Sequence, residues 1–162
     1  MKKILIIFPA ILFVTLTAKG QNLFFIGENS YQSTETITLK SNTEDTSDLN
    51  VLFARDGRTG LIAVIAESSL GSIFSDKLIV YLVDGTVITC NRKTYDLVDN
   101  LAKAVYSFTS DQLNKMKNSN LHTVRYTLEL RADGGRLLGE MSRTASNKEV
   151  QTATLITDFF DN

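Results

Sequence analysis

Residues 75–91 read S-D-K-L-I-V-Y-L-V-D-G-T-V-I-T-C-N and carry the strongest fold signal in the chain. Two apolar, β-branched runs flank the pair Asp84-Gly85, and an Asp-Gly pair suits the positive φ angles of a type I′ turn. The stretch therefore predicts a β-hairpin with a two-residue loop.

This loop would set the register of the hairpin, placing Leu82 opposite Val87. Side chains alternate between the two faces of a strand, so the register also predicts which residues share a face. One face would carry Ile79, Tyr81, Val83, Ile88 and Cys90, and the other Leu78, Val80, Leu82 and Val87. Because both faces are apolar, we expect a second sheet or helices to cover both sides of the hairpin.

The N-terminal residues 1–20 have the pattern of a secretory signal peptide. A short basic start precedes an apolar stretch over 4–16, and small residues follow at Ala18 and Gly20. The apolar stretch is short for a membrane-spanning helix, so we predict cleavage after Gly20, with an uncleaved anchor as the alternative. The short basic start is typical of bacteria. The pattern predicts an exported protein, periplasmic or extracellular, with no stable membrane insertion after cleavage.

Charge and cysteine content limit the classes of partner. The 162-residue chain has 17 Lys plus Arg and 18 Asp plus Glu, and loss of three lysines with residues 1–20 leaves 14 against 18, a formal charge of −4. Nucleic acids and anionic membranes select clustered basic residues, so neither is an expected partner. The sole cysteine, Cys90, allows no intramolecular disulfide. The length of residues 21–162 predicts a single β-rich domain.

Four further segments have the composition of strands. Residues 49–54 and 61–66 would form a second hairpin, and 61–66 is apolar at every position, as in a central strand covered on both faces. Residues 121–131 alternate as in a strand with one wet face, and 101–108 favours a strand. One or two strands are expected within 22–40. Residues 92–108 also fit a helical spacing, and we favour a loop or a helical turn over 95–100 before the strand 101–108.

Two helices are predicted from capping patterns. Thr109 with Gln112 forms a capping box at the start of a short internal helix, and Ser146 with Glu149 would open a C-terminal helix. Threonines within 146–160 leave a strand open as the alternative. The expected fold class is α+β, a mainly antiparallel sheet, sandwich-like or helix-covered, with these two helices.

Candidate binding residues are Arg55, Asp56 and Arg58, in the loop between the two strands of the second hairpin. Loop tips carry function when function exists, so these charges could contact an anion or a carbohydrate, but we favour a solvated turn, because loop tips are usually charged for solubility. The carboxylates of Glu44, Asp45 and Asp48 do not have the spacing of an ordered calcium loop, and we interpret them as a solvated loop.

No catalytic, cofactor-binding or metal-binding set emerges from the residue pattern. His122 is the sole histidine and heads the apolar face of its strand, where we expect a packing role. Cys90 has no flanking cation to lower its pKa, so we expect a buried, inert thiol. The leading hypothesis is a non-enzymatic, exported binding module for a protein, peptide or glycan.

Two alternatives stay open. One is a carboxylate-dependent hydrolase, for which the candidate carboxylates are Asp56, Asp84, Asp96 and Asp99. The other is a structural or secretion accessory protein that self-associates through an exposed strand edge.

Overall fold

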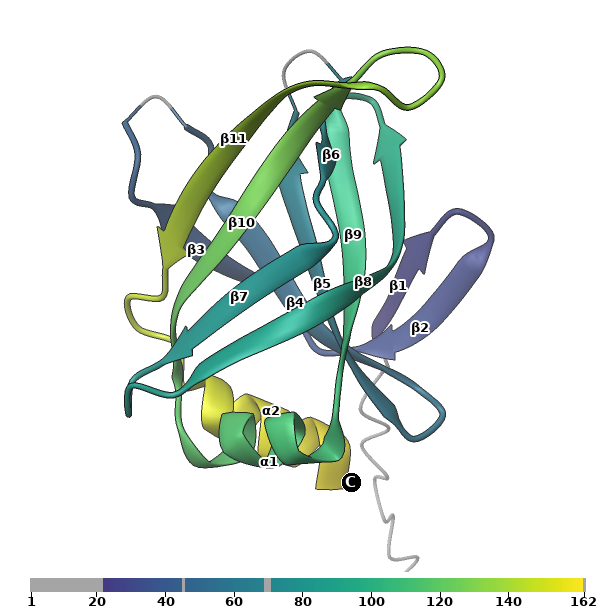
Figure 1. Ribbon diagram of the computed structural model, residues 1–162. Helices are drawn as coiled ribbons and strands as arrows, with labels where there is room; N and C mark the ends of the chain where they lie inside the picture. Colours follow the sequence, from purple (N-terminus) through teal and green to yellow (C-terminus); the bar gives the residue numbers. More distant parts are fainter. Residues whose placement is uncertain (1–21, 45, 69–70, 162) are drawn as a thin grey trace, which may run out of the picture.

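The computed structural model describes residues 22–44, 46–68 and 71–161, and its centre is a closed antiparallel β-barrel of eight strands (Figure 1). Around the barrel the strands follow the order β4-β3-β11-β10-β7-β8-β9-β5, and β5 pairs again with β4. The barrel strands are β3 (Ile37–Ser41), β4 (Leu49–Asp56), β5 (Thr59–Glu67), β7 (Lys77–Leu82), β8 (Val87–Val98), β9 (Leu101–Phe108), β10 (Leu121–Arg131) and β11 (Leu137–Ser146).

The predicted α+β class, with a sandwich-like or helix-covered sheet, is therefore wrong. The apolar face of the sheet turns inward on itself, so the barrel interior takes the place of a second sheet. Periodicity identified the strands, but closure depends on pairs that are far apart in the chain, such as Ser41 with Ala145. Local patterns carry no information about such pairs.

The hairpin of β7 and β8 forms, but its predicted register is wrong by one residue. Tyr81 pairs with Val87, and the loop contains three residues, 83–85. Gly85 has a φ of 87° whereas Asp84 has no positive φ, so the turn is not type I′. The side chain of Asp84 instead accepts a hydrogen bond from the Thr86 amide at 2.9 Å.

The shifted register changes which residues of the hairpin share a face. Leu78, Val80 and Leu82 now point into the barrel together with Ile88 and Cys90. The opposite face is open to solvent at Val87, which is 54% exposed. The expectation that both faces of this hairpin are covered is therefore wrong.

Strand β5, by contrast, is covered on both faces, as its continuous apolar run predicted. Its inner face joins the barrel core through Ile62 and Val64. On the outside, a hairpin of β1 (Asn22–Ile26) and β2 (Asn29–Ser33) covers Leu61 and Ala63. The hairpin and the outer barrel face form a second, smaller core of Phe24, Ile26, Tyr31, Leu52, Ala54, Leu61, Ala63 and Val105.

Helices α1 (Ser110–Asn118) and α2 (Thr152–Asp161) pack together across one end of the barrel (Figure 1). The predicted capping box of Thr109 and Gln112 is confirmed at the start of α1. The C-terminal helix also forms, but Ser146 does not open it. Ser146 is the last residue of β11, and the helix begins at Thr152. Met116 and Ile156 close the barrel core from this end.

The remaining differences lie in the strands. Residues 95–98 continue β8 rather than forming a loop or helical turn, and the chain reverses at Asp99 and Asn100, which have positive φ angles. The short strand β6 (Ile73–Phe74) pairs with β10 outside the barrel order. Among the described residues, no helix has the length and apolar content to cross a bilayer. The predicted signal peptide lies outside the described residues.

Candidate functional site

Arg55, the first of the predicted loop residues, lies at the end of β4 and is half-buried. Its Nε donates a hydrogen bond to Oε1 of Gln32 on β2 at 2.8 Å. Its guanidinium lies 5.2 Å from the ring centroid of Phe159 on α2. These contacts tie the β1–β2 hairpin and α2 to the end of β4, so Arg55 has a structural role.

Asp56 and Arg58 have separate surroundings although they are two residues apart. Asp56 forms an ion pair with Lys93 of β8, and Lys93 lies 5.6 Å from the ring centroid of Tyr31. Arg58 is exposed and lines an open hollow of about 320 Å³ beside Thr109 and Ser110, where α1 begins. The three candidate residues therefore do not converge on one site.

The four carboxylates considered for a hydrolase are engaged by different parts of the fold. Asp56 pairs with Lys93, Asp84 holds the β7–β8 turn, and Asp96 accepts a hydrogen bond from the Gly27 amide at 3.1 Å. Asp99 lies in the β8–β9 turn. None of the interactions of the described residues links two of these carboxylates, so no observation favours the hydrolase.

His122 does not share the apolar face of its strand, which corrects the sequence-based expectation. A β-bulge between Leu121 and Thr123 interrupts the alternation, so Leu121 and Val124 are both buried while His122 is exposed. The Nδ1 atom of His122 lies 2.9 Å from the hydroxyl of Thr123.

Asp48, from the predicted solvated loop, pairs with Lys40 at 2.7 Å, and the hydrogen bond from Lys40 lowers the pKa of Asp48.

Cys90 is buried inside the barrel, as predicted. Burial raises the pKa of its thiol to about 12, so the thiolate is not accessible near neutral pH. The tyrosines differ among themselves: Tyr31 and Tyr106 are buried, whereas Tyr95 is 48% exposed. They do not form a common recognition surface.

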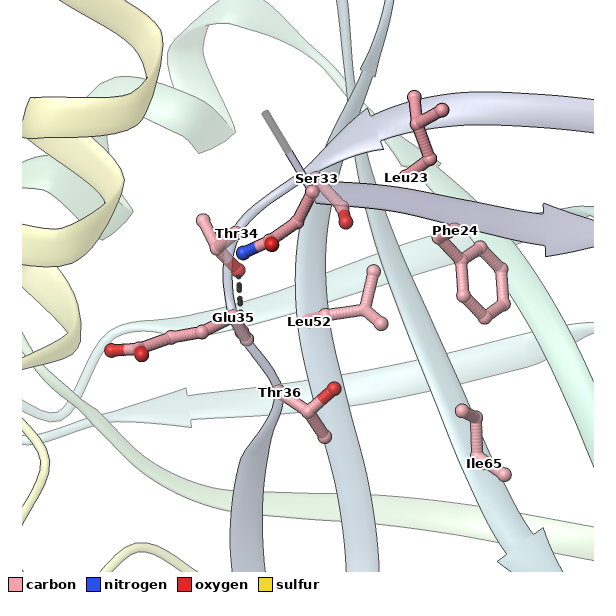
Figure 2. A pocket seen from close by; sticks show the side chains of 9 residues that line it. Leu23, Phe24, Ser33, Thr34, Glu35, Thr36, Leu52 and Ile65 are labelled. Atoms are coloured by element: carbon pink, nitrogen blue, oxygen red, sulfur yellow. Dashed lines mark hydrogen bonds between the residues drawn. The ribbon is translucent and has the colours of Figure 1, made fainter. Parts of the chain in front are cut away.

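A concave surface lies where the β1–β2 hairpin meets the outer face of the barrel (Figure 2). It is an open cleft of about 420 Å³. Phe24, Leu52 and Ile65 face the opening from β1, β4 and β5, and Thr36 lies on its other side. The lining is completed by Asn22, Leu23, Ser33, Thr34 and Glu35. The cleft thus combines apolar side chains with hydroxyl groups, while the side chain of Glu35 points away from Phe24, Leu52 and Ile65.

Strand β1 borders this cleft and is the terminal strand of the sheet. It pairs with β2, and no other described strand lies along its second edge. Its residues Asn22–Ile26 carry no charge. Phe24 and Ile26 point toward the barrel, while Leu23 and Phe25 are 55% and 60% exposed on the opposite face. The sequence analysis expected a strand in this region but did not identify the surface, because an apolar run at 23–26 does not show which of its side chains face solvent.

Comparison with known protein families and with curated proteins gives no match for this chain. Its function is therefore inferred from the residues described above.

Proposed function

We propose that this protein is an exported, non-enzymatic binding module, in the cell envelope or outside the cell, that accepts an extended peptide segment of a partner protein along β1. The observation that carries the proposal is the free edge of β1 beside an apolar cleft. Strand addition to such an edge is a recurring mode of peptide recognition, in which main-chain hydrogen bonds supply affinity and pockets supply specificity.

The free edge is notable because the other long strands of the sheet have a neighbouring strand on each side in the closed barrel. Proteins usually protect an exposed edge with charged side chains, a proline or a bulge, since a bare edge pairs with other chains. Strand β1 has none of these features in Asn22–Ile26 and pairs with β2 without a register shift. An unprotected edge retained beside a closed barrel supports a role in pairing with a partner.

The side chains around β1 indicate the kind of peptide that would fit. Every second residue of β1 directs its N–H and C=O groups away from β2, toward an added strand. On the exposed face, Leu23 and Phe25 would contact apolar side chains at alternate positions of the peptide. On the other face, the cleft would accept a side chain between Phe24 and Ile65.

A photo-crosslinking amino acid at position 25 tests this proposal in cells that produce the protein. The control places the same amino acid at position 83, because Val83 is 64% exposed on the β7–β8 loop, far from β1 in the fold. We expect a defined crosslinked partner at position 25 and none at position 83, with the crosslink mapped to a continuous segment of the partner. Equal crosslinking at both positions would contradict the proposal.

A matched pair of charge variants tests the same surface quantitatively. The partner segment mapped by crosslinking is made as a synthetic peptide, and its affinity for each variant is measured. Phe25→Lys places a charge on the exposed face of β1, whereas Val83→Lys places it elsewhere. We expect Phe25→Lys to weaken binding at least tenfold, about 1.4 kcal/mol, and Val83→Lys to leave it unchanged. If neither variant alters the affinity, the peptide does not bind along β1.

Self-association through β1 is the second candidate, because an uncharged strand can pair antiparallel with its own copy without repulsion. Sedimentation equilibrium distinguishes the two. A dimer that Phe25→Lys converts to a monomer would favour self-association over a separate partner.

A further inference from the structure

Strand β1 crosses the outer faces of several barrel strands instead of running along one of them. It begins beside β4, because Asn22 pairs with Ser33, and Ser33 pairs with Ala54 of β4. Directly after β1, the Gly27 amide donates a hydrogen bond to Asp96 of β8 at 3.1 Å. Strands β5 and β9 lie between β4 and β8 in the sheet. Three strand spacings amount to about 14 Å and the five residues of β1 to about 16 Å, so β1 spans the outer face from β4 to β8.

The free edge of β1 faces a row of outward-pointing side chains on β5 and β9. Along these two strands the pairs Ala63–Val105 and Ile65–Lys103 follow one another, two residues apart and therefore on the same face. The β1–β2 hairpin covers Ala63 and Val105, which belong to the smaller core. Ile65 lines the cleft beside β1. A strand added to β1 would therefore lie over Ile65 and Lys103.

The strand spacing predicts which positions of an added peptide face the barrel. Leu52 of β4 and Ile65 of β5 face the cleft, and Lys103 lies on the next strand at the level of Ile65 (Figure 2). With neighbouring strands about 4.8 Å apart, the middle of the β4–β5 pair lies about 7 Å from β9. Two residues of an extended peptide span about 6.6 Å and direct their side chains to the same face. A peptide side chain in the cleft therefore has one that faces Lys103 two positions away.

Lys103 is half-buried and takes part in none of the ion pairs between described residues. Asp96 pairs with it across β8 and β9, but the two carboxylate oxygens of Asp96 accept hydrogen bonds from the amides of Gly27 and Leu97, at 3.1 and 2.9 Å. Glu67 also points outward, on the side of Lys103 that is remote from β1. The ammonium group of Lys103 can therefore pair with a carboxylate that arrives along β1.

We propose that the β1 site selects a peptide with a bulky apolar residue in the cleft and an acidic residue two positions away, paired with Lys103. This inference rests on the proposed function and adds a specificity-determining residue to it. The side chains of Phe24, Leu52 and Ile65 favour an apolar group, whereas the ammonium of Lys103 favours a carboxylate. The peptide residue between these two would point away from the barrel.

Selection from a library of random seven-residue peptides displayed on phage tests this specificity. The unaltered protein and two variants, Lys103→Glu and Lys115→Glu, serve as targets. Lys115 is the matched control, because it is an exposed lysine on α1, at the helical end of the barrel. We expect an acidic residue two positions from a large apolar one in peptides selected on the unaltered protein and on Lys115→Glu. On Lys103→Glu we expect lysine or arginine at that position.

A synthetic peptide with the enriched sequence gives the size of the effect in calorimetric titrations. Lys103→Met removes the charge and retains a long side chain, so it replaces Lys103→Glu if a second acid beside Asp96 impairs folding. We expect Lys103→Met, or asparagine or glutamine in place of the acidic peptide residue, to weaken binding about threefold, as for a partly exposed ion pair. Combining the two changes should cause no further loss. High salt should reduce the difference between the unaltered protein and Lys103→Met.

The results separate this inference from the proposed function. Binding of the enriched peptides to Phe25→Lys shows whether they bind along β1. Peptides that lose affinity for Phe25→Lys but show no acidic preference would overturn the role of Lys103 and leave the proposed function intact. Peptides that bind Phe25→Lys as tightly as the unaltered protein, or no enrichment at all, would contradict both.

Discussion

Two buried tyrosines in one barrel differ in a single hydrogen bond. Tyr106 donates its hydroxyl hydrogen to the Ser75 carbonyl at 2.8 Å, whereas the Tyr126 hydroxyl has no partner. Both side chains are at most 1% exposed, so their packing contributions are comparable. The pair therefore isolates the effect of one hydroxyl on the stability of the fold.

Replacing each tyrosine by phenylalanine should give opposite results. Tyr106→Phe leaves the Ser75 carbonyl without its donor and should lower the free energy of unfolding by about 1–2 kcal/mol. Tyr126→Phe removes an unpaired group and should leave the free energy unchanged or raise it. Urea denaturation measures both. A larger loss in Tyr126→Phe than in Tyr106→Phe would mean that the Tyr126 hydroxyl has a partner.

Cys90 gives a second prediction at the scale of a residue. Because burial raises the pKa of its thiol to about 12 and the residue is fully buried, a maleimide reagent should modify the native protein at pH 8 far more slowly than the urea-unfolded protein. Rapid labelling without denaturant would show that the β7–β8 side of the barrel opens readily.

Single residues were predictable where the signal is local. The pairing of Thr109 with Gln112 is a contact within one helical turn, and the apolar neighbours of Cys90 implied its burial.

At the scale of elements, Gly60 is the place where β5 leaves room for a side chain of β9. Gly60 pairs with Phe108, and a Cβ atom at Gly60 would lie 1.9 Å from Cε2 of the Phe108 ring. Phe108 also packs edge-on against Phe160 of α2, at 6.1 Å between ring centroids. The absent side chain at Gly60 thus makes room for the ring that links the barrel to its helical end.

Gly60→Ala should therefore lower the free energy of unfolding by about 1–3 kcal/mol, because the Phe108 ring must leave its position. Gly139→Ala is the matched control, since Gly139 also lies in a strand and a Cβ there meets no atom within 4 Å. Thermal denaturation compares the two variants. Equal stability would indicate that Phe108 moves without cost.

The type of an element, strand or helix, was predictable more often than its first and last residues. Apolar runs located β4, β5 and β7, and alternation located β10. The end of β8 was missed because its last residues are exposed or half-exposed, so no periodicity marks them. The bulge at His122 and the three-residue loop at Asp84 each shift the alternation by one, which sequence periodicity alone does not reveal.

For the whole molecule, closure of the barrel depends on strand junctions that differ in their number of paired residues. Strands β4 and β5 share seven residue pairs, whereas β3 and β11 share two. The second junction joins residues about a hundred positions apart, so no local pattern could have predicted it. This explains why the strands were largely anticipated while the closed barrel was not.

The barrel should open first at the β3–β11 junction. Local opening requires the least free energy where few hydrogen bonds and contacts are lost. In native-state hydrogen exchange, the Asn42 amide, which bonds Thr144 across this junction, should exchange faster than amides bonded between β4 and β5. Equal protection at the two junctions would show that the barrel unfolds as one cooperative unit.

The most direct test of peptide addition along β1 is hydrogen exchange of its amides with the crosslink-identified peptide bound. Strand addition predicts that exchange slows at alternate residues of β1, the ones whose N–H groups point away from β2, and is unchanged at Val83. Slowed exchange confined to other surfaces, with β1 unaffected, would contradict the proposed function.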